Sequence, residues 1–152
     1  MPRPALAHLP LAALLLGVGT LHFTRPAFFL AIMPPWLPWH AALVWLSGVA
    51  EVVAGALLLP ASTRRHGGWL AAATMIAVWP ANWHHALAGG VHDPALPAWM
   101  GDATVAWIRL PLQLPLVAFA IAIARGRYGA LPSSWASASR TAATSRSASE
   151  AS

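Results

Sequence analysis

Four apolar runs, each near the length that crosses a lipid bilayer, constrain this chain more than any other sequence feature. A helix rises about 1.5 Å per residue, so about 20 apolar residues cover a hydrocarbon core roughly 30 Å thick. The runs lie at about residues 5–24, 40–60, 68–88 and 103–124. Charged residues make up only 9% of the 152 residues, against about 25% in ordinary soluble domains. The sequence therefore predicts an all-α, polytopic membrane protein: a bundle of four transmembrane helices.

A cleavable signal peptide is the alternative interpretation of the first run, because Arg3 precedes an apolar stretch. No cleavage site with small residues follows that stretch, and Arg25 and Pro26 stand where cleavage would be needed. We therefore expect the first run to stay in the protein as a span.

A short interfacial helix is expected after the first span, over residues 27–33. Pro26 can open such a helix, and the pair Pro34 and Pro35 must end it, because proline has no amide hydrogen to donate. Tryptophans are concentrated at the same expected side of the membrane, where amphipathic rings favour the headgroup region. They are Trp36, Trp39, Trp83, Trp99 and Trp107.

The connections predict one membrane domain, residues 1–128, and one tail. A short polar link at 61–67 makes the second and third spans antiparallel neighbours. Gly89 and Gly90 end the third span, residues 91–101 form an exposed loop, and Asp102 is placed to cap the fourth span. Residues 129–152 are rich in serine and alanine and are expected to be a disordered cytoplasmic tail.

Basic residues orient the expected bundle. Only Arg25 falls on the side of the two longer connections, whereas the opposite side carries Arg3, Arg64, Arg65, Arg125 and Arg127. The positive-inside rule then places both termini in the cytoplasm. The arginines are dispersed and form no basic face for a phosphate backbone, so a nucleic-acid partner is not expected.

Polar side chains inside the spans are the candidate site, because each is expensive in lipid unless it is paired or hydrated. On the span limits above, Glu51 lies about 16 Å below the outer face, Gln113 about 14 Å and Arg109 about 8 Å. The charges on Glu51 and Arg109 predict an ion pair with Asn82 close by. The candidate ligand or proton site comprises His22, Glu51, Asn82, His85, Arg109 and Gln113.

Two interpretations of this polar set stay open. It can be a structural network that holds the helices together, or it can line an outward-facing cavity for a small polar or quinone-like ligand. Glu51 shares a helical stripe with Ser47, Gly48 and Gly55, so another helix is expected to approach that face.

Several classes of chemistry are not expected. The chain has no cysteine, which excludes a disulfide framework and thiolate ligands. His84 and His85 with His92 and Asp93 do not have the spacing of a compact metal motif, so no metal site is predicted. No catalytic motif is visible, and catalytic residues stay unassigned.

Four motifs resemble the DoxX family of small bacterial membrane proteins. They are MPPWLP at 33–38, LSGVAE at 46–51, PAN at 80–82 and RLPLQ at 109–113, and the likeness covers about residues 10–125. The resemblance implies a four-helix bundle in a bacterial inner membrane, associated with membrane redox work, as in a thiosulfate–quinone oxidoreductase subunit or an oxidative-stress complex.

On this resemblance, the expected function is a subunit or accessory of a quinone-linked membrane oxidoreductase. Its expected partners are the lipid bilayer and other oxidoreductase subunits, with quinone as the candidate cofactor and a homo-oligomer left open. The alternatives are a standalone carrier or binding module for a small molecule, and a non-catalytic membrane anchor. Neither alternative is excluded by the residues, because a fold can host unrelated functions.

Overall fold

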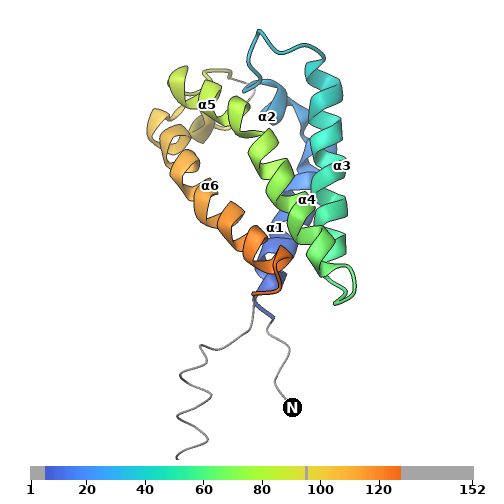
Figure 1. The fold of residues 1–152 in the computed structure, drawn as a ribbon. Coiled ribbons are helices and arrows are strands. Elements are labelled where there is room, and N and C mark those ends of the chain that lie inside the picture. Colours follow the sequence, from blue (N-terminus) through green and yellow to red (C-terminus); the bar gives the residue numbers. More distant parts are fainter. Residues whose placement is uncertain (1–5, 95, 128–152) are drawn as a thin grey trace, which may run out of the picture.

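Helices account for all the regular secondary structure in residues 6–94 and 96–127, which are the residues that the computed structural model describes (Figure 1). The all-α prediction is therefore confirmed for these residues. Arg3 and the expected tail at 129–152 lie outside them. The elements are α1 (His8–Thr24), α2 (Pro26–Leu30), α3 (His40–Leu58), α4 (Arg64–Ala77), α5 (Trp79–Leu87), the 3-10 helix η1 (Ala98–Gly101) and α6 (Ala103–Ala124).

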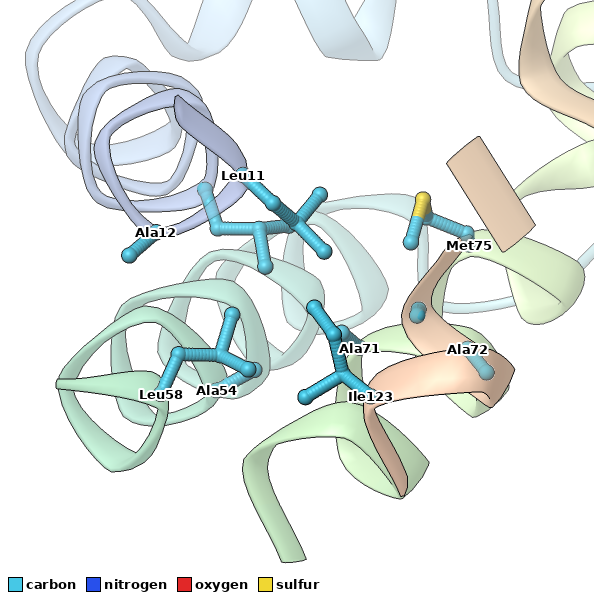
Figure 2. Close-up of a cluster of buried hydrophobic side chains, with 10 residues drawn as sticks. Leu11, Ala12, Ala54, Leu58, Ala71, Ala72, Met75 and Ile123 are labelled. Atoms are coloured by element: carbon cyan, nitrogen blue, oxygen red, sulfur yellow. The ribbon is translucent and has the colours of Figure 1, made fainter. Parts of the chain in front are cut away.

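The long helices pack in the order α1, α3, α4 and α6, while α1 and α6 touch each other only slightly. The start of α1, the α3–α4 connection and the end of α6 lie at one end of the bundle, with α2 and α5 at the other (Figure 1). Figure 2 shows the core near the first end, where small side chains allow close approach. This core comprises Leu11, Ala12, Leu15, Ala54, Leu58, Ala71, Ala72, Met75, Ala120 and Ile123.

Two adjacent arginines tie the helix ends together at this end of the bundle. The Nε atom of Arg64 donates to the Leu58 carbonyl at 3.0 Å, and Nε of Arg65 donates to the Ala124 carbonyl at 3.1 Å. The last carbonyls of a helix lack intrahelical donors and carry partial negative charge, so a guanidinium there is favourable. Arg64 thus supplies a hydrogen-bond donor to a carbonyl in the last turn of α3, and Arg65 supplies one to the last carbonyl of α6.

The third apolar run is not one continuous helix, so the expected span at 68–88 is wrong in that respect. It forms α4 and α5, which are separated at Val78. Pro80 lies in the first turn of α5, where its missing amide hydrogen is tolerated; inside a continuous helix its ring would clash with the carbonyl of Ile76. Proline therefore breaks the run while leaving both halves helical.

Within the described ranges, two helices are long and apolar enough to cross a membrane: α3, with 19 residues, and α6, with 22. The first apolar run forms α1, a shorter apolar helix of 17 residues. The expected helix at 27–33 is shorter than predicted and ends at Leu30. Single turns then follow, with the Met33 amide donating to the Leu30 carbonyl at 3.2 Å.

The cap of α6 is as predicted. One carboxylate oxygen of Asp102 accepts hydrogen bonds from the backbone amides of Thr104, at 2.7 Å, and Val105, at 3.3 Å. These donors stabilise the charged carboxylate and so lower the pKa of Asp102 below its ordinary value.

This cap makes a small part of the stability depend on pH. Because the folded-state pKa is lowered, the contribution is present above the unfolded value of about 4 and is lost as pH falls through the folded value. We expect the unfolding temperature of the wild type to fall more than that of Asp102→Asn when pH is lowered from about 5 to about 2.5. Asparagine caps helices well but does not titrate. Parallel pH curves for the two proteins would contradict this assignment.

Candidate functional site

A cavity of about 700 Å³ lies between the helices and is lined by residues of α1 to α6 and of the segment after α2. Most of its lining is aliphatic or aromatic. The polar side chains that reach it are His22, Ser47, Glu51, Thr74, Asn82, Arg109 and Gln113. Five of the six candidate site residues predicted from the sequence therefore line a single cavity. The sixth, His85, lies behind the wall and contacts Arg109.

The end of the bundle beside α2 and α5 is covered by a small apolar cluster. Ile32, Leu96 and Met100 are buried together, with Phe28 and Val91 packed against them. The Val91 amide donates to the Met100 carbonyl at 2.7 Å and holds η1 in place. The segment predicted from the sequence as an exposed loop, 91–101, is thus not wholly exposed, because Val91, Leu96 and Met100 pack in a cluster with Ile32, which follows α2.

One wall of the cavity carries a chain of hydrogen bonds. Gln113 Nε2 donates to the Met75 carbonyl, in the last turn of α4, where intrahelical donors run out. Asn82 Nδ2 donates to Gln113 Oε1 at 2.8 Å, and Arg109 Nη2 donates to Asn82 Oδ1 at 3.3 Å. This chain joins α4, α5 and α6 across the break at Val78.

His85 completes the chain and has a defined protonation pattern. Its Nε2 lies 2.9 Å from the Met100 carbonyl, which can only accept, so Nε2 carries the hydrogen. Its Nδ1 lies 3.4 Å from Nη1 of Arg109, which can only donate, so Nδ1 is the acceptor. The neutral imidazole therefore positions the Arg109 guanidinium at the cavity.

A different part of the cavity wall carries Glu51, from α3. Its Oε2 lies 3.6 Å from Nδ1 of His22, and that nitrogen lies 2.9 Å from the Val18 carbonyl. A carbonyl only accepts, so the Nδ1 hydrogen of His22 is directed to Val18 and not to Glu51. Among the described residues, Glu51 Oε2 is buried without a hydrogen-bond partner.

The expected pair between Glu51 and Arg109 is not formed. Glu51 has His22 as its ionisable neighbour, and no carboxylate lies within 4.0 Å of Arg109 in the described part of the chain. The packing order explains the difference: α6 packs against α4 and α5 rather than against α3. Arg109 therefore meets Asn82 and His85, and the two opposite charges remain separate at one cavity.

The approach of α1 to α3 fixes the position of His22. A Cβ atom added at Gly48 would lie 2.6 Å from Cβ of His22, and one at Gly55 would lie 3.0 Å from the Ala12 carbonyl oxygen. The prediction that a helix approaches this small-residue stripe is therefore confirmed. The imidazole of His22 also stacks on Phe29 of α2, with the ring centroids 3.5 Å apart.

Thr74 and Phe29 also line the cavity, and neither was predicted from the sequence as a site residue. Thr74 is a buried polar residue in the middle of the third apolar run, and that was the available signal. Phe29 gave no comparable signal, because only the fold of α2 beside α1 brings its ring to His22.

No group of three histidine, aspartate or glutamate side chains that could hold a metal ion occurs in residues 6–94 and 96–127.

Comparison with protein families gives a match to residues 11–124, most of the chain. The chain belongs to the family described as Domain of unknown function (DUF8561). The DUF8561 match includes every residue that lines the cavity, from Leu14 to Leu116. Searches of curated proteins and of solved structures gave no match. The DUF8561 description assigns no activity, so a function has to come from the geometry of the cavity.

Proposed function

We propose that this protein is a four-pass integral membrane protein that binds a small, largely apolar molecule with a polar head in its cavity. The observation that carries the proposal is the cavity itself: about 700 Å³ of mostly apolar lining with a few polar groups. Small-molecule sites usually have this character and this size. A polar network that served only to join helices would need no such space beside it.

The apolar exterior supports a membrane location. Only 33% of the most apolar window of α3, and 28% of that of α6, is buried inside the protein, whereas a core helix of a soluble protein is mostly buried. Large apolar side chains are exposed on all the long helices. Those that do not line the cavity include Leu21, Phe23, Trp45, Val49, Val53, Ile76, Ile108 and Leu114. In this proposal, α1, α3 and α6 cross once each, and α4 with α5 makes one broken crossing.

The charge distribution supports cytoplasmic termini in a bacterial inner membrane. Arg64 and Arg65 begin α4, and Arg125 and Arg127 follow α6, whose last carbonyl accepts from Arg65. Arg25 stands between α1 and α2, and Figure 1 shows α2 at the opposite end of the bundle from the start of α4 and the end of α6. The positive-inside rule then directs the first end to the cytoplasm. A helix break that lines a cavity is also the form in which irregular backbone is tolerated at membrane depth.

The redox association rests on the resemblance to the DoxX family. Guanidinium and amide groups can donate to the carbonyl oxygens of a quinone, and the aliphatic lining suits its tail. We therefore propose a subunit or accessory of a quinone-linked oxidoreductase, and a standalone carrier is the second candidate. Co-purification of an oxidoreductase subunit from native membranes supports the first, and a retained small molecule without such a partner supports the second.

The binding function can be tested with two alanine positions on α3. Ala50 lines the cavity, whereas Ala41 is exposed and does not. We expect native mass spectrometry of the full chain in native-lipid particles to detect a retained small molecule. Ala50→Phe should lower its occupancy about tenfold or more by filling the space that the molecule uses, and Ala41→Phe should not. Equal retention by both variants, or no retained molecule in the wild type, would refute the proposal.

A further inference from the structure

We infer that the cavity selects a net-neutral head group that carries both a hydrogen-bond donor, bound by Glu51, and an acceptor, bound by Arg109. A hydroxyl-bearing amphiphile such as a phenol or a quinol meets this description. A head with carbonyl or ether oxygens alone does not. The inference rests on the proposed binding function and names the class of molecule that the same cavity takes.

The donor requirement comes from Glu51. Its side chain is buried, with 6% of the residue exposed, and its Oε2 atom has no hydrogen-bond partner among the described residues. The nearest nitrogen, Nδ1 of His22, directs its hydrogen to the Val18 carbonyl. A buried carboxylate oxygen without a donor is unfavourable, and hydrogen bonds to charged acceptors are the strong ones. A ligand O–H or N–H group is the missing partner.

The acceptor requirement comes from Arg109. A guanidinium has five N–H donors and no acceptor. Asn82 and His85 take one contact each, and they hold the group against the cavity wall. The remaining N–H groups have no carboxylate within 4.0 Å in the part of the chain that the structure describes. An acceptor atom on the ligand head complements this wall.

The net-neutral requirement comes from charge balance. When Glu51 is ionised, its charge is opposite to that of Arg109, and the cavity wall that carries both is then close to neutral before a ligand enters. A ligand with a net charge would leave one charge uncompensated in a weakly polarisable environment, which is costly. A quinol offers a donor and an acceptor without a net charge, whereas the oxidised quinone offers acceptors only and leaves Glu51 unpartnered.

The test compares 4-hexylphenol with 4-hexylanisole, which have the same apolar body but differ in the donor. Binding is measured to the full chain in phosphatidylcholine nanodiscs, and the signal from Ala50→Phe is subtracted as membrane partitioning. We expect wild type to bind the phenol about tenfold or more tightly than the anisole, the usual gain from a hydrogen bond to a charged group. Glu51→Gln should reduce that preference to about threefold or less. Asp93→Asn, which removes an exposed carboxylate outside the cavity, should leave it unchanged.

The outcomes separate the inference from the proposed function. If wild type binds both probes equally well, the head-group inference is overturned while ligand binding stands. If neither probe binds and no molecule is retained from native membranes, the proposed function fails and the inference with it. A preference for phenol that survives Glu51→Gln also overturns the assignment of Glu51. Should Glu51→Gln fail to fold, the wild-type ratio of the two affinities still decides whether a donor is selected.

Discussion

Replacing Gln113 by leucine is expected to lower the free energy of unfolding by about 1–4 kcal/mol, because the buried Met75 carbonyl and the half-buried Asn82 amide both lose their partner. Gln113 is 7% exposed, donates to the Met75 carbonyl and accepts from Asn82. Leucine has a similar size but can do neither. The Asn82 amide would be left to turn away from Arg109, so the order of the whole wall should also decrease. Thermal or denaturant unfolding of the purified protein in detergent measures the effect.

Thr20→Val is the control for loss of a hydrogen bond as such. Thr20 is exposed on α1, and its hydroxyl donates to the Leu16 carbonyl at 2.7 Å within the same helix. Its replacement leaves no buried polar group unpaired, so the change should stay within about 0.5 kcal/mol. If Gln113→Leu is as stable as Thr20→Val, the chain of hydrogen bonds that runs from the Met75 carbonyl to His85 does not hold the helices together.

The elements that the sequence predicts well are those fixed by local chemistry. Asp102 caps α6 because a carboxylate just before an apolar helix finds unpaired amides, whatever the rest of the chain does. Gly89 and Gly90 both have positive φ and follow the end of α5, as a glycine pair after an apolar run predicts. Pro80, inside the third apolar run, was the available signal for the break at Val78, but the prediction of one span over 68–88 followed only the apolar length of the run.

The pairing of polar groups could not be predicted in the same way. Depth along a helix follows from residue number, and it places Glu51 and Arg109 within reach of a common cavity. Which helices are neighbours depends on packing of the whole bundle, where α4 lies between α3 and α6. The same limit applies to Leu96 and Met100, because their burial depends on where α2 folds back. To predict these contacts, the arrangement of the helices in space would have been needed in addition to the chemistry of the residues.

Gly48→Ala is expected to destabilise the protein by about 1–3 kcal/mol, although alanine favours a helix over glycine. The new methyl group would lie 2.6 Å from Cβ of His22, closer than real Cβ contacts allow, so α1 must move away from α3. That movement carries His22 and its stacking on Phe29 away from Glu51. Binding of 4-hexylphenol should therefore weaken together with the unfolding temperature.

Gly17→Ala separates this steric effect from helix propensity. Gly17 lies on the exposed side of α1, and a Cβ atom there would meet nothing within 4 Å. The substitution should leave stability unchanged or raise it by up to about 1 kcal/mol, with phenol binding intact. A Gly48→Ala protein as stable as Gly17→Ala would mean that α1 and α3 pack more loosely than the structure has them. In that case, the position of His22 beside Glu51 would not depend on the small-residue stripe, and the geometry that leaves Glu51 Oε2 open to a ligand would need another cause.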